Sequence, residues 1–190
     1  VHGAPYGKGC ILDVLAAVPL LVVTAPDMAV LAMVIRRDSP GPALFRQERI
    51  GYAGRPFTVL KFRSMVVGAQ SMGAGLAVAE GDERITRAGR VLRRLSLDEL
   101  PQLLNIVRGD MSLVGPRPTV ASQVERYDAE QRRRLLARPG LTGLAQISGR
   151  TSIPWAERIA IDLDCVYRWC MRRDLAILAR TVAVVLRREG

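Results

Sequence analysis

Two adjacent carboxylates, Asp98 and Glu99, form the densest concentration of chemistry-bearing residues in the sequence. Four arginines precede them, namely Arg87, Arg90, Arg93 and Arg94. A carboxylate among arginines stays ionised, as a nucleophile or a metal ligand must. The pair also has a purely structural interpretation, because acidic residues at a helix start complement the helix dipole by about 0.3–1 kcal/mol. Leucines flank the pair, which favours a partly buried cleft, and Asp98 and Glu99 are our candidate catalytic residues.

Four short strings place a cation beside glycine, proline or another cation. They are Lys61-Phe62-Arg63, Gly115-Pro116-Arg117-Pro118, Arg138-Pro139-Gly140 and Gly149-Arg150. Arginine offers two parallel donors to phosphate oxygens, and proline fixes a loop at low entropic cost. Any one of these residues is equally compatible with a surface turn. Several of them converging on the carboxylates would form a phosphate site with a nucleophile or a Mg²⁺ anchor.

The composition narrows the class of protein. Among 190 residues, 28 lysines and arginines outnumber 18 acidic residues, giving a net charge of +10. This surplus favours nucleic acid, acidic lipid or phosphorylated substrates as partners. Only 5% of residues are aromatic, so a stacking surface for nucleic acid is not expected, and we predict no nucleic-acid partner. His2 is the single histidine, which argues against a Ser-His-Asp triad or a histidine-ligated zinc site.

Residues 11–35 form an apolar segment that, as a helix, would extend about 37 Å, enough to cross a bilayer core of about 30 Å. Pro19 and Pro26 interrupt it, and Asp27 places a carboxylate near its middle. Basic residues flank both ends, which favours both ends on the same side of a membrane. A re-entrant helix, a break and a second helix fit these features best. A transmembrane span and a buried core helix are the alternatives.

The rest of the chain predicts a small, mainly helical α+β domain. Residues 43–50 and 56–62 are β-prone and read as a hairpin with the loop 51–54 between them. We predict a mobile loop over residues 66–81. Residues 85–105 read as helical, with an interruption at Ser96.

At that interruption, Ser96 is the expected N-cap of a new helix, and Glu99 completes a capping box. Residues 119–137 also read as helical, and residues 140–150 as a glycine-rich loop before a helix starting near Ile153. The last segment, 174–188, predicts an amphipathic helix. Its apolar face consists of Leu175, Leu178, Val182 and Val185. This face is expected either to pack on the core or to lie on a membrane.

Taken together, these strings resemble the bacterial sugar transferase family, the monotopic phosphoglycosyltransferases that start glycan assembly on a polyprenyl phosphate carrier. The resemblance runs from about Lys8 to the C-terminal helix. Its motifs are Asp38-Ser39-Pro40-Gly41-Pro42 with Leu44-Phe45-Arg46-Gln47-Glu48-Arg49-Ile50-Gly51, Lys61-Phe62-Arg63-Ser64-Met65, the string from Arg93 through Gln102, Gly109-Asp110-Met111-Ser112-Leu113-Val114-Gly115-Pro116-Arg117-Pro118, and Arg138-Pro139-Gly140-Leu141-Thr142-Gly143.

The resemblance implies a reaction and assigns roles within it. Asp98 would attack the β-phosphate of a UDP-sugar, release UMP and form a phosphosugar–aspartyl intermediate that polyprenyl (undecaprenyl) phosphate then attacks. Glu99 would help to place Mg²⁺ or handle a proton, so Asp98 and Glu99 are also the implied metal ligands. Four cations match the family's positions around the phosphates, and Asp162 matches a polar position of the C-terminal part. The four cations are Lys61, Arg93, Arg117 and Arg150.

The family also implies a membrane seat. Residues 1–37 would form the re-entrant element with Pro26 at its break, and residues 38–190 the cytosolic catalytic domain. The enzyme would act at the cytoplasmic face of the bacterial inner membrane, as the first membrane step of exopolysaccharide, capsule, O-antigen or glycoprotein glycan synthesis. Lipids, a second copy of the chain and later glycosyltransferases are the implied further partners. The sequence departs from the family pattern at Gly9-Cys10, Ala25-Pro26-Asp27, Leu144 and Cys165.

Overall fold

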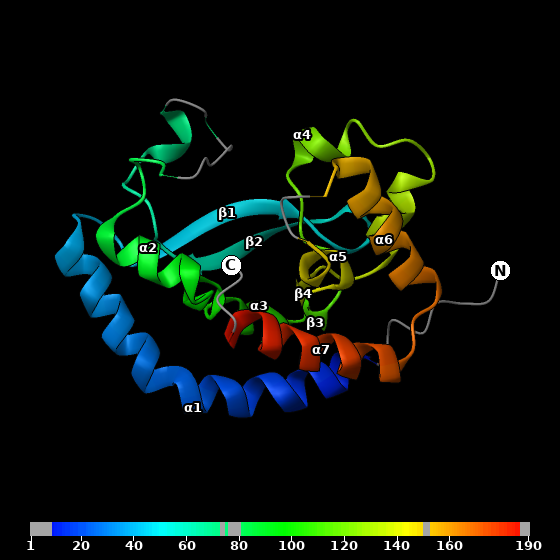
Figure 1. The fold of residues 1–190 in the computed structure, drawn as a ribbon, viewed down its shortest axis with the longest axis horizontal. Coiled ribbons are helices and arrows are strands. Elements are labelled where there is room, and N and C mark those ends of the chain that lie inside the picture. The colour runs from blue at the N-terminus through cyan, green and yellow to red at the C-terminus, as the bar shows by residue number, and fades with distance from the viewer. Residues whose placement is uncertain (1–8, 73–74, 76–80, 150–152, 187–190) are drawn as a thin grey trace.

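The computed structural model describes residues 9–72, 75, 81–149 and 153–186, and has the predicted mainly helical α+β architecture (Figure 1). The helices are α1 (Gly9–Asp38), α2 (Arg87–Arg94), α3 (Gln102–Arg108), α4 (Ala121–Val124), α5 (Leu144–Ile147), α6 (Trp155–Tyr167) and α7 (Met171–Leu186). The strands are β1 (Leu44–Ile50), β2 (Pro56–Phe62), β3 (Ser112–Val114) and β4 (Gly140–Thr142). Four 3₁₀ turns complete the fold: η1 (Tyr52–Gly54), η2 (Ala69–Ser71), η3 (Leu97–Glu99) and η4 (Gln131–Leu136).

Helix α1 runs along one side of the molecule and packs against it near both ends. Ala17 is fully buried against α3, and Ile35 is buried against β2 and α2. Asp13 accepts a hydrogen bond from the backbone nitrogen of Leu113 at 3.1 Å, and Asp38 accepts one from that of Ala88 at 2.9 Å. The helix is therefore attached to the same domain at its beginning and at its end.

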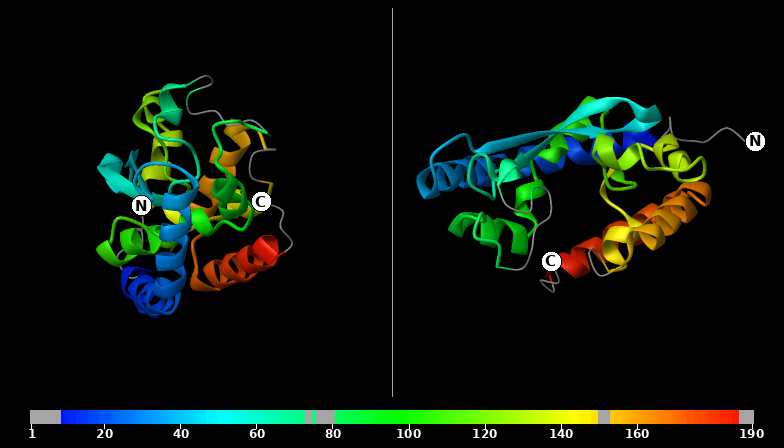
Figure 2. Two further views of the ribbon diagram at one scale, coloured as in Figure 1. Left: turned by 90° about the vertical axis from the view of Figure 1, so that its left-hand side faces the viewer. Right: turned by 90° about the horizontal axis from the view of Figure 1, so that it is seen from above.

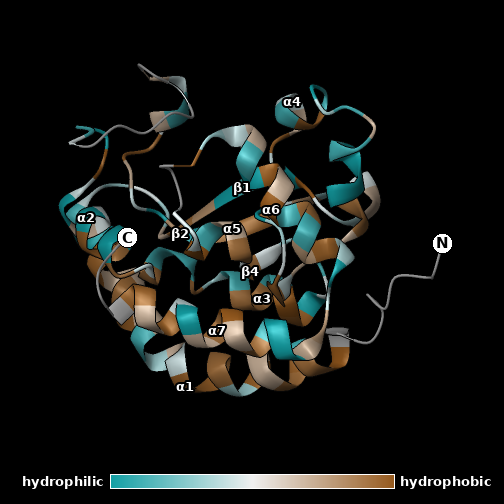
Figure 3. Cartoon of the chain, turned by 45° about the vertical axis from the view of Figure 1, so that its right-hand side comes forward, coloured by the Kyte–Doolittle hydropathy of each residue, from teal (hydrophilic) through white to brown (hydrophobic). Residues whose placement is uncertain are grey.

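The opposite face of α1 is apolar and exposed (Figure 3). Its exposed large side chains are Ile11, Leu12, Leu15, Val18, Leu20, Val22, Val23, Val30, Met33 and Val34. By length and composition the helix could cross a membrane, and only 6% of its most apolar window is buried. An apolar surface of this extent marks a contact with a membrane or another protein.

The predicted break at Pro26 is absent, because α1 is helical through both Pro19 and Pro26. The helix curves instead, as Figures 1 and 2 show. Each proline removes one helical N–H donor, which permits bending without ending the helix. The hydroxyl of Thr24 also bonds the carbonyl of Leu20 at 2.8 Å, an i−4 contact that bends helices. The prediction of two helices separated by a break was therefore wrong.

The predicted hairpin is confirmed: β1 and β2 pair antiparallel, from Leu44 opposite Phe62 to Ile50 opposite Pro56. Helix α3 fastens to the edge of β2 through Asn105, which is fully buried. Its side-chain oxygen accepts the backbone N–H of Leu60 at 3.0 Å, and its amide donates to the carbonyl of Thr58 at 2.7 Å. The amide group thus continues the strand's hydrogen bonding and fixes α3 beside β2.

A second, parallel strand pair joins two of the glycine- and proline-containing strings. Ser112 lies opposite Gly140, and Val114 opposite Thr142. Glycine is required here because a Cβ on Gly140 would lie 2.1 Å from the backbone nitrogen of Gly115. This close approach holds the chain segment that leads from β3 into Arg117.

The C-terminal part differs from the prediction in two places. Residues 119–137 contain only the short helix α4 and the turn η4, with an irregular segment between them, instead of one long helix. In α7 the deeply buried side chain is Ile177, whereas Leu175 and Val182 of the predicted apolar face are 61% and 58% exposed. That predicted face is therefore mainly on the surface. Figure 2 shows α6 and α7 forming a layer separate from the hairpin.

Candidate functional site

The two candidate carboxylates lie on η3 (Leu97–Glu99), between α2 and α3. Ser96, just before the turn, adopts a left-handed backbone conformation with φ of 55°, and its side chain makes no capping hydrogen bond. The predicted capping box was therefore wrong, and α3 begins only at Gln102. A non-glycine residue in this region carries strain, and such strain concentrates at functional sites. Here it produces the sharp reversal that presents Asp98 and Glu99 beside β2.

Glu99 is the anchored member of the pair. Its Oε1 accepts from Nζ of Lys61 on β2 and from Nη2 of Arg117, each at 2.9 Å. The hairpin and the loop after β3 thereby supply one cation each to the same carboxylate oxygen. The sequence prediction that distant cation-bearing strings converge on the carboxylates is confirmed for Lys61 and Arg117.

Asp98 is the free member of the pair. Among the residues that the structure describes, its carboxylate makes no hydrogen bond or ion pair. It still lies within the field of Lys61, Arg93 and Arg117, whose positive charges favour its ionised form. The arrangement thus leaves one carboxylate held by cations and its neighbour available to react.

The electrostatics of the pair follow this difference. Burial and the charge of Glu99 raise the pKa of the Asp98 carboxyl, and the surrounding cations offset that rise only in part. Burial also acts to raise the pKa of Glu99, but attraction to Arg117 and Lys61 outweighs it and lowers that pKa to about 2. In return, Glu99 raises the pKa of Arg117. Glu99 is therefore a permanent anion.

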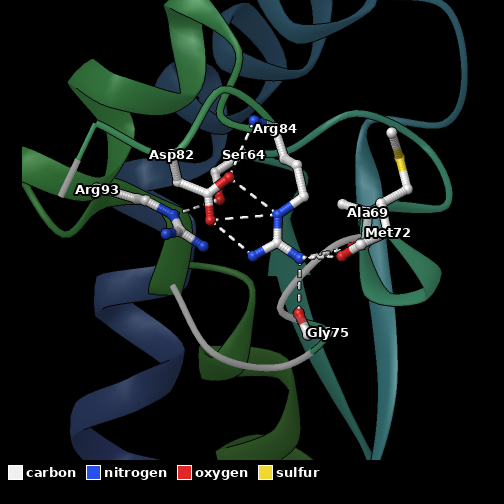
Figure 4. Close-up of polar contacts among 7 residues, drawn as sticks. All are labelled: Ser64, Ala69, Met72, Gly75, Asp82, Arg84 and Arg93. Carbon is white, nitrogen blue, oxygen red and sulfur yellow. Dashed lines mark hydrogen bonds and ion pairs between the residues drawn. The ribbon is translucent and has the colours of Figure 1, made fainter. Parts of the chain in front are cut away.

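Arg93, at the end of α2, is oriented by a residue that the sequence analysis did not select. Its Nε donates to the hydroxyl of Ser64 at 2.9 Å (Figure 4). Helix α2 lies directly on the backbone of Ser64, because a Cβ on Gly89 would come within 1.9 Å of the Ser64 carbonyl oxygen. Ser64 directly follows the Lys61-Phe62-Arg63 string, and this position is the only sequence signal that it carries.

Figure 4 also shows how the neighbouring segment is held. The guanidinium of Arg84 bonds Asp82 and donates, at 2.8 Å each, to the carbonyls of Ala69, Met72 and Gly75. The described part of the predicted mobile loop is therefore tied to one buried arginine. Val66 and Arg84 join through a backbone hydrogen bond of 2.9 Å, which closes the segment beside Ser64.

Ser64→Ala is expected to lower the rate of the reaction at Asp98 about tenfold, because a hydrogen bond to a charged group contributes about 1.5 kcal/mol. Arg93 would keep its charge and lose its fixed orientation. The measurement is a double-mutant cycle with Arg93→Ala, in which the serine change should have no further effect once the arginine is absent. Ser148→Ala, which removes an exposed hydroxyl on α5, is the control. Equal losses in both arginine backgrounds would refute the coupling.

Two predicted residues stand apart from this cluster. Arg150 lies outside the described residues. Asp162, on α6, is buried and forms an ion pair with Arg134, whose Nε lies 2.7 Å from Oδ2. Arg134 in turn donates to the backbone carbonyl of Arg117 at 2.8 Å. In this arrangement Asp162 reaches the site only through Arg134, as a positioning residue.

Two further residues near the pair were missed by the sequence analysis. Burial and the neighbouring charge of Arg117 lower the pKa of Arg49, on β1, to about 10. Arg49 therefore adds a cation close to Arg117. Gln102 is buried one turn after Asp98, and its Nε2 has no partner among the described residues. No pattern in the sequence separates either residue from ordinary strand and helix positions.

The donor set for a metal consists of the two carboxylates. In the described part of the chain, no group of three or more His, Cys, Asp or Glu side chains could hold an ion. Mg²⁺ uses one or two carboxylates, waters and substrate phosphates, so it does not need such a cage. Asp98 and the second oxygen of Glu99 provide a compatible donor set.

A free carboxylate, an anchored carboxylate and several cations define a site for phosphorylated substrates with a nucleophile in place. Comparison with known proteins gives the family. The sequence profile of the bacterial sugar transferases matches residues 8–188, and the chain belongs to this family of transferases.

Three relatives illustrate its neighbourhood. The UDP-glucose:undecaprenyl-phosphate glucose-1-phosphate transferase of Caulobacter vibrioides is 49% identical, over 93% of this chain and 68% of its own length. The undecaprenyl-phosphate galactose phosphotransferase of Salmonella typhimurium is 42% identical, over 94% of this chain and 40% of its own length. The exopolysaccharide production protein ExoY of Rhizobium meliloti is 40% identical, over 94% of this chain and 85% of its own length.

Proposed function

We propose that the protein transfers a sugar-1-phosphate from a UDP-sugar to polyprenyl phosphate and releases UMP. The observation that carries this proposal is the unequal pair, in which cations hold Glu99 and leave Asp98 free. The names of two relatives support the acceptor, because both refer to undecaprenyl phosphate. The name of a third supports a place in exopolysaccharide production. The reaction would be the first membrane step of glycan assembly.

In the proposed chemistry, an Asp98 carboxylate oxygen attacks the β-phosphorus of the UDP-sugar. A bond forms between that oxygen and phosphorus, and the bond from phosphorus to the bridging oxygen breaks, so UMP leaves with the electron pair. The product is a phosphosugar–aspartyl enzyme. A phosphate oxygen of the polyprenyl phosphate then attacks the same phosphorus, which returns Asp98 to its carboxylate and completes a two-step transfer.

The surrounding residues act on charge and position. Lys61, Arg93 and Arg117 lie where they would balance the charge of the diphosphate and of the leaving UMP. Glu99 fixes two of these cations through Oε1. With Asp98 it would also hold Mg²⁺, which supplies positive charge to the diphosphate when bound.

We place the protein at the cytoplasmic face of the inner membrane, with α1 inserted shallowly and both of its ends on the cytoplasmic side. The attachment of Asp13 and Asp38 to one domain supports this topology, since a helix held at both ends lies along that domain. A curved helix with an exposed apolar outer face suits entry into one leaflet. The lipid phosphate lies at the same depth, so a shallow enzyme could meet it there.

The direct test of this function is UMP release from a panel of UDP-sugars, with polyprenyl phosphate and Mg²⁺ present. Release with one donor, and its loss when Mg²⁺ is chelated, is the expected result. The competing possibility is a silent membrane scaffold whose basic surface binds anionic lipid or a later glycosyltransferase. Absence of release with every donor, together with tight binding to anionic vesicles, would favour that scaffold.

Arg117→Ala is expected to reduce UMP release by about 10²-fold or more, because it removes one preorganised donor to the phosphates and half of the anchor of Glu99. Membrane association should persist, since Arg117 lies on the loop after β3, whereas the apolar face belongs to α1. Vesicle co-sedimentation measured beside the activity checks both statements. Arg126→Ala, an exposed arginine near α4, is the matched control. Full activity of the Arg117 variant would remove it from the phosphate site.

A further inference from the structure

An apolar pocket lies between the N-terminal half of α1, the strand β3 and helix α7, outside the carboxylate cluster. Its volume is about 270 Å³. Leu12 and Ala16 line it from α1, Leu113 and Pro116 from β3 and the loop that follows, and Leu175 and Leu178 from α7. None of these residues takes part in the chemistry proposed above.

The charged groups of the pocket argue against an anionic occupant. Asp13, Asp174 and Arg138 are its charged lining residues, so the carboxylates outnumber the cation. Asp13 is engaged by the backbone nitrogen of Leu113 at 3.1 Å, and Asp174 by the indole nitrogen of Trp169 at 2.8 Å. A nucleotide or a phosphate would face like charges here, whereas an uncharged hydrocarbon would contact the apolar walls.

The pocket is joined to the carboxylate cluster by one short chain segment. Gly115 and Pro116 line it, and the next residue, Arg117, bonds Glu99 at 2.9 Å. Consecutive Cα atoms are about 3.8 Å apart, so the pocket wall and the phosphate site are neighbours. The pocket also adjoins the exposed apolar face of α1, because Leu12 belongs to both. Figure 3 shows α1 and α7 side by side at this end of the molecule.

We propose that this pocket binds the first isoprene units of the lipid phosphate acceptor, with the acceptor's phosphate directed past Arg117 toward Asp98. The proposal rests on the proposed function, since it concerns the second substrate of the same reaction. It divides the two substrates between two places: the charged cluster takes both phosphates in turn, and the apolar pocket takes only the acceptor's chain. A change in the pocket should therefore affect the second step and spare the first.

The test is Leu178→Trp, which fills the pocket from α7, in the full chain reconstituted in nanodiscs. Without acceptor, the variant should give the same burst of UMP as the wild type. With acceptor, its KM for long polyprenyl phosphate should rise about tenfold, as expected when a few methylene groups lose burial. The KM for a short isoprenyl phosphate should change less. Val182→Trp, one turn further along α7 and exposed, is the matched control.

Ala16→Phe, which fills the pocket from α1, repeats the test if the tryptophan variant does not fold. An unchanged KM in both variants would overturn the proposal. So would a lost UMP burst in a folded variant, because the pocket would then serve the donor. Failure of the proposed function itself is distinguishable, since it would show as no UMP burst in the wild type.

A second readout does not depend on turnover. A polyprenyl phosphate analogue carrying a diazirine in its first isoprene units should label α7 or the segment around Leu113 and Pro116. Excess unlabelled polyprenyl phosphate should compete, and excess phospholipid should not. Labelling that phospholipid displaces would assign the pocket to bulk membrane lipid, and labelling confined to other segments would exclude the acceptor. Either result would overturn the proposal.

Discussion

Asp98→Asn is expected to abolish UMP release, a loss of at least about 10³-fold in rate, and to prevent labelling of the protein by the donor's phosphosugar. Asparagine keeps the shape of the side chain and removes the nucleophilic oxygen. The cation cluster should remain in place, because Lys61 and Arg117 are held by Glu99 and not by Asp98. Donor binding should therefore persist in the variant while the chemistry stops.

The measurement combines UMP release with intact-protein mass after incubation with a UDP-sugar and no acceptor. The wild type should gain the mass of one sugar phosphate, and the variant should gain nothing. Asp128→Asn, which removes an exposed carboxylate on the segment before η4, is the control. Release of UMP by the wild type only when acceptor is added, with no adduct at any time, would favour a direct single-step transfer.

The parts of the site that sequence analysis located share a simple origin. Lys61 and Arg117 lie in strings with strong local constraints, the end of a hairpin strand and a loop fixed by prolines. Such segments keep their form in many contexts, so their side chains could be assigned to one site from residue type and spacing. The close pairing of Gly115 with Gly140 explains why these strings contain glycine.

The errors arise where distant contacts override local preference. Ser96 and Glu99 fit a capping box, but Glu99 binds two cations from other elements, and the local turn becomes left-handed instead. Residues 119–137 fit a charged helix, yet Arg134 turns inward to Asp162 on α6. The apolar period of α7 gives no hint that Ile177 faces the core. Neither did any local signal reveal Ser64, because its role depends on Arg93 approaching from another helix.

The buried ion pair between Arg134 and Asp162 gives the largest expected effect on stability. Both side chains are only 5% exposed, and Arg134 also donates to the hydroxyl of Tyr127 at 3.0 Å. Burial raises the pKa of Asp162, and attraction to Arg134 opposes that rise. The pair therefore carries a desolvation cost that only both partners together offset.

Asp162→Asn should consequently lower the free energy of unfolding by about 3–5 kcal/mol, because the arginine would stay buried without its counter-ion. In a chain of this size that corresponds to a drop of roughly 10 °C in Tm. Thermal unfolding in detergent measures it, with Glu130→Gln as the control, since Glu130 pairs with Arg133 on the surface and should change stability by less than about 1 kcal/mol.

Replacing both partners, as Arg134→Met with Asp162→Leu, should recover most of the lost stability, because apolar side chains of similar volume avoid the desolvation cost. Activity should not recover with it. Arg134 donates to the backbone carbonyl of Arg117, so its removal frees the loop that anchors Glu99. A double variant with restored Tm and restored UMP release would show that the ion pair is purely structural. Restored Tm without restored release would show that it also positions Arg117.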